Sequence, residues 1–263
     1  MPAEPVPGVR LLDVLREDAV GTFAVGVDVA TGARVGVRRL HGKHEGDDGA
    51  RLLFAEEVRR VATLDDPLLL RTLRHDAAAP VPWMVTEAID GETLEGDVAR
   101  AAWPSDLARG FAASVARAFL ALASRRQFHA APVPSRIVRV GEGWRLLTFR
   151  DVRAEDEASR LRGRVAALGP FAAPELAAGS TAPITGRSLC VHAVGALWSF
   201  LRAGGAGPAR PAAASTDPDD AIVARLLEPD PVRRPPDAAS VLALLGEAPP
   251  PAPTRRSWRE RPG

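Results

Sequence analysis

The chain has 263 residues, a formal net charge of +1 and a hydrophobic content of 46%. This length suits one domain of two lobes better than two independent domains, and the composition is that of an ordinary folded globule. A charge this close to zero gives no global basic field, which argues against a nucleic-acid partner.

Compartment signals in the sequence are few. Cys190 is the only cysteine, so no internal disulfide forms, which fits a reducing cytoplasm. The first ten residues lack the apolar core of a signal peptide, and no apolar run approaches the ~20 residues of a membrane span. We therefore expect a cytoplasmic protein without a membrane-spanning helix.

Strand signals dominate the first forty residues. Residues 23–27 are β-prone, residues 33–40 alternate apolar with polar side chains, and Gly32 supplies a turn between them. Residues 15–22 precede the first of these strands, and we interpret them as a hairpin tip. Gly21 is the only glycine in that tip.

A helix follows, and then two more strands. Apolar side chains recur near the helical period over residues 50–64, with Asp47 or Asp48 as the candidate cap. Residues 68–73 and 83–89 read as strands. These elements complete a lobe that is rich in β-structure.

A long helix and a small hairpin come next. Residues 107–124 are strongly apolar at helical spacing, which predicts a core helix. Residues 129–136 are rich in turn formers. The two apolar pairs at 137–138 and 146–147 flank a Gly-bearing turn, which predicts two short antiparallel strands.

The loop, the hairpin and the tripeptide Thr148-Phe149-Arg150 resemble the catalytic loop and metal-binding segment of a protein kinase. Further motifs stand in the same order as in that family. They are the strand ending in Arg38, the helix with Glu57, a hinge-like stretch at 82–94, Ala-Pro-Glu at 173–175 and Asp-Pro-x-x-Arg-Pro at 230–235. From residue 11 to 245 the chain thus resembles a degenerate bacterial Ser/Thr kinase of the protein-kinase-like superfamily.

The resemblance implies an α+β, two-lobed protein-kinase-like fold. Residues 9–90 would form the small antiparallel β-rich lobe with helix C, and residues 91–246 the larger, mainly helical lobe. Residues 247–263 form a Pro-rich and basic tail, which we expect to be disordered; contact with an anionic membrane surface is the alternative. The short Gly-, Ala- and Pro-rich stretch at 204–220 replaces a helix that the family usually has there.

The reactive positions of the kinase template carry the wrong residues. Ala131 stands at the catalytic base, Arg136 at the magnesium-binding Asn and Thr148 at the magnesium-binding Asp. The chain contains no Asn at all, so no other Asn can replace it. Mg²⁺ requires oxygen ligands and phosphoryl transfer requires positioned Mg²⁺. We therefore expect no catalytic residue, no metal site and no phosphoryl transfer.

The remaining pocket positions are also altered. Gly21 is the only survivor of the glycine-rich loop. Arg38 falls on the phosphate-gripping lysine and Glu57 on its helix C partner, so the two would form an ion pair. The alternatives are a surface arginine on the strand and a solvated glutamate on the helix.

The hinge depends on backbone groups. Thr86 corresponds to the gatekeeper, and the backbone of Glu87 and Ile89 would face an adenine ring. An adenine slot could survive, because backbone groups do not depend on side-chain identity, or the chain's own side chains could fill it. Metal-independent ATP binding therefore stays open, and no other cofactor is expected.

The resemblance also assigns residues in the larger lobe. Glu175 would pair with Arg234, whereas Cys190 and Ala130 replace two parts of a polar anchor beneath the catalytic loop. Ser159, Ser180 and Thr181 are candidate phosphorylation sites in and after the activation segment at 151–169, where nearby arginines could hold a phosphate.

Three other residues are considered and set aside. His41 and His44 are candidate metal ligands, but we expect them to lie in a solvated loop without a metal. Asp151 lies beyond the metal-ligand position, on the far side of Phe149, and is not expected to replace that ligand.

The sequence thus predicts a pseudokinase that acts as a signalling scaffold or allosteric regulator by binding proteins. The expected partner is a phosphothreonine-binding protein or a kinase, in the cytoplasm or at the inner face of the membrane. An atypical Ser/Thr kinase and an ATP-binding nucleotide sensor are the alternatives.

Overall fold

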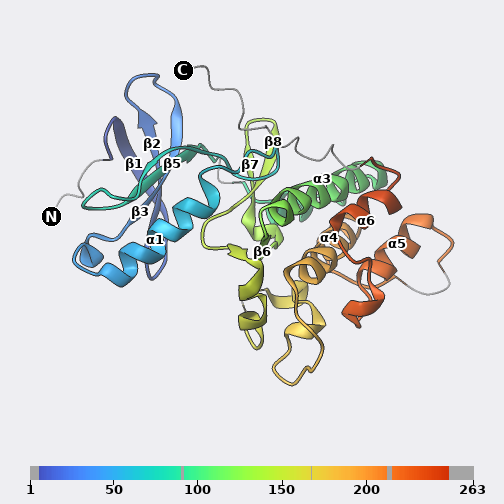
Figure 1. The fold of residues 1–263 in the computed structure, drawn as a ribbon. Coiled ribbons are helices and arrows are strands. Elements are labelled where there is room, and N and C mark those ends of the chain that lie inside the picture. Colours follow the sequence, from blue (N-terminus) through green and yellow to red (C-terminus); the bar gives the residue numbers. More distant parts are fainter. Residues whose placement is uncertain (1–5, 90–91, 167, 212–214, 249–263) are drawn as a thin grey trace, which may run out of the picture.

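A computed structural model describes residues 6–89, 92–166, 168–211 and 215–248, which form two lobes side by side (Figure 1). The smaller lobe contains five antiparallel strands in the order β1-β2-β3-β5-β4. Their bounds are β1 (Val9–Glu17), β2 (Gly21–Asp28), β3 (Arg34–Leu40), β4 (Thr72–Asp76) and β5 (Trp83–Glu87). The expected lobe boundary at residues 90 and 91, and the tail from 249 onward, lie outside the described residues.

One strand was not expected, and another has different bounds. β1 lies before the first predicted strand and continues to Glu17, so the expected tip at 15–22 shrinks to a tight turn whose N–H groups at Val20 and Gly21 bond Asp18 Oδ1 at 2.8 and 3.0 Å. β4 begins at Thr72, not at residue 68. Residues 68–70 differ because they pair with the larger lobe: Leu68 and Leu70 each exchange a backbone hydrogen bond with Leu146.

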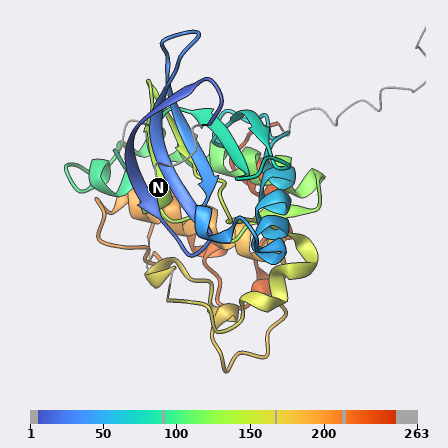
Figure 2. The ribbon, with the colours of Figure 1, turned by 90° about the vertical axis from the view of Figure 1, so that its left-hand side faces the viewer.

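Helix α1 (Asp48–Val61) lies beside the sheet (Figure 2). It begins where expected, because the Asp47 carboxylate accepts the Ala50 N–H at 3.0 Å. One face of the helix is buried, through Ala50, Phe54, Glu57, Val58 and Val61. The helical period of the apolar residues therefore carries Glu57 into the interior with them.

The larger lobe is mainly helical. Its helices are α2 (Leu94–Val98), α3 (Ser105–Ser124), α4 (Gly186–Arg202), α5 (Pro218–Leu226) and α6 (Ala238–Leu244). The core of the lobe gathers on α3 and α4, where Phe119, Leu122 and Trp198 are fully buried. The expected loss of a helix within 204–220 agrees with the described part of that stretch, which is irregular up to the start of α5.

α3 meets the length and composition of a membrane span, which the sequence analysis did not expect. Half of its apolar window is buried within the protein. Two of its arginines also form ion pairs, Arg109 with Asp219 of α5 and Arg117 with Glu247 at 2.5 Å. These contacts place α3 as a core helix of the larger lobe.

Short strands and 3-10 turns make up the remaining elements. The hairpin of β7 (Ile137–Val140) and β8 (Gly143–Leu146) is present as expected, and β6 (Gln127–His129) pairs with β9 (Val152–Ala154). The 3-10 turns are η1 (Gly42–His44), η2 (Pro134–Arg136), η3 (Glu155–Leu161), η4 (Gly169–Phe171), η5 (Pro174–Leu176) and η6 (Pro231–Arg233). Most of the candidate site residues lie on or next to these short elements.

Candidate functional site

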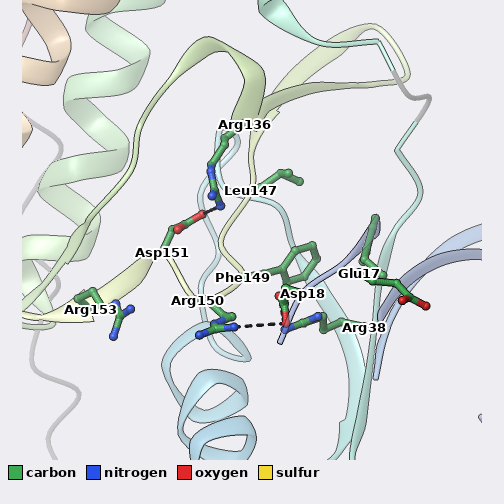
Figure 3. A pocket seen from close by; sticks show the side chains of 10 residues that line it. Glu17, Asp18, Arg38, Arg136, Leu147, Phe149, Arg150, Asp151 and Arg153 are labelled. Atoms are coloured by element: carbon green, nitrogen blue, oxygen red, sulfur yellow. Dashed lines mark hydrogen bonds and ion pairs between the residues drawn. The ribbon is translucent and has the colours of Figure 1, made fainter. Parts of the chain in front are cut away.

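A cavity of about 250 Å³ opens between the lobes (Figure 3). Four arginines and three carboxylates line it, together with two phenylalanines and a leucine: Arg38, Arg136, Arg150, Arg153, Glu17, Asp18, Asp151, Phe23, Phe149 and Leu147. The lining thus combines residues of β1, the β1–β2 turn, β2 and β3 with Arg136 of η2 and the segment that follows β8.

Arg38 is almost completely buried, at 2% exposure, and is not a surface residue of β3. Its Nε donates to Glu57 Oε1 at 3.1 Å, so the expected ion pair between β3 and α1 is present. Burial raises the pKa of Glu57, and the Arg38 charge offsets only part of that rise. Because Glu57 is also buried, the alternative of a solvated glutamate does not apply.

Asp18 is the second carboxylate on Arg38, at 2.9 Å from Nη2 (Figure 3). Burial alone would raise the pKa of Asp18, but the N–H groups of Val20 and Gly21 and the Arg38 charge outweigh it and lower the pKa to about 2. Asp18 Oδ1 also accepts from Arg150 at 3.3 Å. The ionised Asp18 side chain therefore binds the Arg38 guanidinium, which stands where the kinase template has its phosphate-binding lysine.

The histidines of the 41–44 loop hold this turn in place. His41 Nε2 lies 2.9 Å from the Asp18 carbonyl oxygen, and His44 Nε2 lies 3.0 Å from that of Ala19. Both histidines are half-buried, and the loop between them is exposed, so the loop is solvated as expected although each ring also contacts the turn. Gly21 ends the turn for a packing reason: a Cβ there would lie 2.2 Å from the Arg39 carbonyl oxygen.

Arg136 and Asp151 form an ion pair on the opposite wall of the cavity (Figure 3). Asp151 was not expected to replace the metal ligand, and its side chain lines the same cavity as Phe149. The carboxylate is engaged by the arginine that stands at the metal-binding Asn. Thr148 is buried, and its Oγ1 has no hydrogen-bond partner among the described residues.

The hinge strand β5 uses its polar groups internally. Thr86 is fully buried, and its Oγ1 donates to the Glu87 carbonyl oxygen at 2.9 Å. The Glu87 N–H donates to the Arg71 carbonyl oxygen at 3.2 Å. Beside this strand, the ring of Phe23 belongs to a buried cluster with Leu70, Ile89, Val138 and Leu147. Of the two alternatives for the slot, this packing favours a slot filled by the chain's own side chains.

The catalytic-loop segment is held by a neutral histidine. His129 Nε2 lies 2.7 Å from the Leu147 carbonyl oxygen, and its Nδ1 accepts the Ala131 N–H at 3.3 Å. Burial lowers the pKa of His129 to about 4, so the ring is uncharged at neutral pH. Ala131 is buried beside it and offers only a methyl group at the base position.

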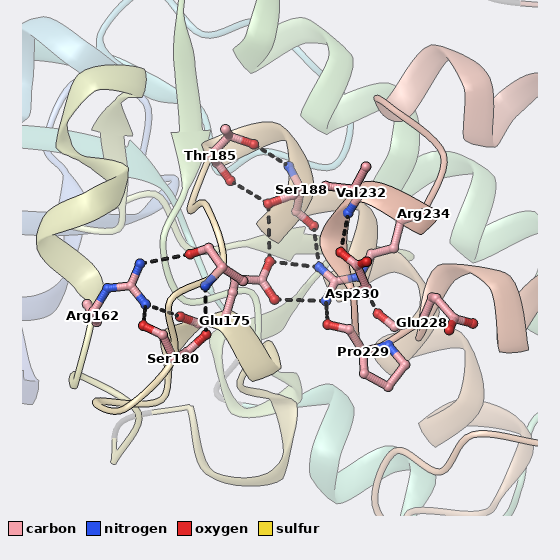
Figure 4. Close-up of polar contacts among 11 residues, drawn as sticks. Arg162, Glu175, Ser180, Thr185, Ser188, Glu228, Pro229, Asp230, Val232 and Arg234 are labelled. Atoms are coloured by element: carbon pink, nitrogen blue, oxygen red, sulfur yellow. Dashed lines mark hydrogen bonds and ion pairs between the residues drawn. The ribbon is translucent and has the colours of Figure 1, made fainter.

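The expected Glu175–Arg234 ion pair is present, and both side chains are fully buried (Figure 4). It is a two-pronged contact, with Nη1 to Oε1 at 2.7 Å and Nη2 to Oε2 at 2.8 Å. Burial alone would raise the pKa of Glu175, but Arg234 and the Ser188 hydroxyl lower it below its usual value. The pair joins the Ala-Pro-Glu turn to the segment before α6.

The candidate phosphorylation sites differ in access. Ser159 and Thr181 are exposed, whereas Ser180 is half-buried and its Oγ accepts the Ala182 N–H at 3.3 Å. Arg162 holds the backbone here through the carbonyl oxygens of Glu175, Ser180 and Ala182 (Figure 4). Its guanidinium is therefore already engaged.

The donor set of the cleft does not fit Mg²⁺. Thr148 offers a neutral hydroxyl, Arg136 a cation, and the Asp151 carboxylate is paired with that cation. Among residues 6–89, 92–166, 168–211 and 215–248, no group of three or more His, Cys, Asp or Glu side chains is arranged to hold a metal ion. The same arrangement does fit a network of internal ion pairs.

Sequence reasoning missed two important residues, Asp18 and Phe23. A signal for Phe23 was available in Gly36 of β3, where a Cβ would lie 2.8 Å from the Phe23 ring and 2.4 Å from Thr86 Oγ1. Asp18 lies in the stretch at 15–22 that was interpreted as a hairpin tip. Its contact with Arg38 depends on the turn geometry, which the sequence pattern did not specify.

Solved structures of the kinase domain of Mycobacterium tuberculosis PknI are similar to this chain. One matches with a TM-score of 0.61 and 19% identity, over 91% of this chain and 95% of that chain. A double mutant of the same domain matches with a TM-score of 0.64 and 20% identity, over the same shares of the two chains. No family model matches the sequence, and neither does any curated protein. Together with the two lobes and the order of the motifs, these similarities show that the chain adopts the protein-kinase-like fold.

Proposed function

We propose that this chain is a pseudokinase: a kinase-like domain that binds protein partners and does not transfer phosphate. The observation that carries the proposal is the Arg136–Asp151 ion pair. It places a cation and its carboxylate partner where the kinase template holds a divalent ion. Since phosphoryl transfer depends on that ion and on a positioned hydroxyl, this cleft lacks the means for the reaction.

The packing of the hinge supports the same proposal. Phe23 lies among the apolar side chains next to β5, and the Glu87 carbonyl and N–H groups both have partners within the chain. An adenine ring would have to compete with the packing of the Phe23 ring, and the Glu87 N–H is already bonded to the Arg71 carbonyl oxygen. Breaking such contacts costs free energy, since buried polar groups are expensive to leave unpaired.

A melting titration with ATP, ADP and adenosine, each with and without Mg²⁺ or Mn²⁺, tests the proposal. We expect no change in Tm with any of them. A ligand at 100 times its Kd would stabilise the protein by ~2.7 kcal/mol, which is a shift of several degrees for a chain of this size. A metal-dependent shift with ATP would overturn the proposal.

Radiolabelled ATP distinguishes the proposed pseudokinase from the alternative, an atypical kinase. Incubation with either divalent ion and a mixture of protein substrates should give no transfer of label. Transfer that is abolished by Arg38→Ala would establish an enzyme that uses relocated residues.

A nucleotide sensor is favoured by one observation, the four arginines that line the cavity. All four already contact carboxylates, because Arg38 and Arg150 pair with Asp18, Arg136 pairs with Asp151 and Arg153 lies 4.0 Å from Glu157. A metal-independent Tm shift with ATP but not with adenosine would support the sensor over the scaffold.

The partner we propose is a protein that recognises this chain once it is phosphorylated, or the kinase that phosphorylates it. Ser159 and Thr181 are exposed and can be reached by another kinase. Mass spectrometry after incubation with an active Ser/Thr kinase should find phosphate on one of them. An unmodified chain would exclude this route of recognition.

A further inference from the structure

We propose that Asp18 acts as an internal ligand of the cleft, and that the chain of contacts Arg38–Asp18–Arg150 holds the two lobes closed without any bound molecule. Asp18 belongs to the small lobe, in the turn between β1 and β2. Arg150 follows Phe149 in the larger lobe. Their side chains meet across the cavity at 3.3 Å (Figure 3).

The charge balance makes Asp18 suited to this role. Arg38 is buried and touches two carboxylates, Glu57 at 3.1 Å and Asp18 at 2.9 Å. Asp18 in turn is shared between Arg38 and Arg150. Four charges of alternating sign therefore run from α1 to the larger lobe. Asp18 is the member that spans the cleft at the cavity. Two further ion pairs join the lobes elsewhere, Arg60 with Glu157 at 3.2 Å and Arg145 with Glu87 at 2.8 Å.

Backbone strain at Arg150 is an independent sign that this contact has a function. Arg150 has a φ of 56°, in the left-handed region that favours glycine. A non-glycine residue persists there only when its surroundings hold it, and such strain gathers at functional sites. This conformation aims the guanidinium toward Asp18, which a glycine at the same position could not do.

An aromatic contact adds an apolar part to the closure. The rings of Phe23 on β2 and Phe149 lie 4.7 Å apart between centroids. Phe149 and Arg150 are consecutive, so adjacent residues of the larger lobe contact the small lobe by packing and by charge. The two contacts therefore close the cleft at the cavity, in addition to the pairing of residues 68–70 with Leu146.

A distance measurement between the lobes tests whether the Arg38–Asp18–Arg150 contacts hold them closed. Spin labels on Val29→Cys in the small lobe and Val232→Cys in the larger one use two exposed positions. The native Cys190 is buried, and burial raises its pKa to about 12, so it stays unlabelled. The parent protein should give one narrow distance distribution, and adding ATP should not change it.

Asp18→Asn keeps the size of the side chain and removes its charge. We expect the population of longer distances to rise about fivefold, the change in an equilibrium that a partly exposed ion pair can produce. Asp28→Asn is the matched control. Asp28 also accepts turn N–H groups and pairs with an arginine, Arg74 at 2.9 Å, but within the small lobe. The control should keep the narrow distribution.

Arg150→Gly removes both the contact with Asp18 and the backbone strain at residue 150, and a second variant distinguishes the two effects. Arg150→Gly should open the lobes as Asp18→Asn does, and combining the two substitutions should add little further opening, because both remove the same contact. Arg126→Gly is its control, since Arg126 has a φ of 57° at the end of α3, away from the cavity. That variant relieves similar strain and should leave the lobes closed.

Salt provides a second readout. Raising the ionic strength from about 0.1 M to 1 M shortens the Debye length from about 10 Å to about 3 Å, so the parent protein should open partly while Asp18→Asn responds much less. A narrow distribution that survives both Asp18→Asn and Arg150→Gly would overturn the proposal. It would leave the pseudokinase proposal untouched, since that depends on Arg136 and Asp151.

Discussion

At the scale of single residues, the cleft is rich in arginine, including the positions that the kinase resemblance assigns to a lysine and an asparagine. Arg38, Arg136 and Arg150 each find a carboxylate within the cleft. The sequence predicted the Arg38–Glu57 pair, because the strand and helix motifs fix where each residue lies. It did not predict the partners of Arg136 and Arg150, since these depend on loop conformations that no periodic pattern encodes.

The buried pair of Glu175 and Arg234 permits a quantitative prediction. Arg234→Met should lower the free energy of unfolding by about 3 to 5 kcal/mol, because it leaves a carboxylate buried without its partner. Arg233→Met is the neighbouring control, and this side chain is 71% exposed. That change should cost less than about 1 kcal/mol. Denaturant unfolding of the two variants measures the difference, and equal losses would contradict the expectation.

Asp18 gives a prediction for pH. Its pKa is about 2 in the folded protein and 3.8 in the reference state, so its ionised form stabilises the fold fully above pH 3.8 and loses that effect as the pH falls toward 2. The stability difference between the parent protein and Asp18→Asn should be constant near neutral pH and shrink through this acidic window. Denaturant midpoints across the range provide the measurement, and a difference that persists at pH 2 would contradict it.

At the scale of elements, β2, β3 and β5 pack closely because β3 has a glycine at the position where the three strands meet. Gly36 of β3 lies directly opposite Thr86 of β5, and the Phe23 ring of β2 covers the same spot. A larger residue at 36 would collide with both. The alternation of β3 was visible in the sequence, but the reason for its glycine was not, because it lies in a neighbouring strand.

Gly36→Ala tests this interlocking. On its own it should destabilise the protein by about 1 to 3 kcal/mol through overpacking. Phe23→Val should also destabilise it, through the cavity left in a buried cluster. Combined, they should cost less than the sum, because the smaller valine makes room for the new methyl group. Thermal unfolding of the two single variants and the double variant measures whether their effects on stability add. Gly42→Ala, with no neighbouring atom within 4 Å, is the control.

At the scale of the whole molecule, the two lobes and the order of the motifs could be predicted from the sequence with few errors. The long helix, the cleft hairpin and the Ala-Pro-Glu turn all lie where the patterns put them. Besides β1, which was not predicted, the main error falls where the lobes meet. Residues 68–70 were expected to continue a strand of the small lobe, but they bond to β8 of the larger one. Such contacts depend on how the lobes dock, which local patterns do not record.

Cys190 offers a measure of global unfolding. It lies on α4 at 4% exposure, and burial raises its pKa to about 12. We expect a thiol reagent to label it at least about a thousandfold more slowly than a free cysteine, since reaction requires the larger lobe to open. Val232→Cys, in an exposed position, should react at once. Comparable rates for the two thiols would show that the larger lobe opens locally.

One more consequence follows from Arg162. Its guanidinium binds carbonyl groups from Glu175 to Ala182, so the chain between them forms a ring that a single side chain closes. A protease cut inside this ring would leave both new ends tethered to the body of the protein. The nicked molecule should therefore migrate as two fragments under denaturing conditions and as one particle in native buffer.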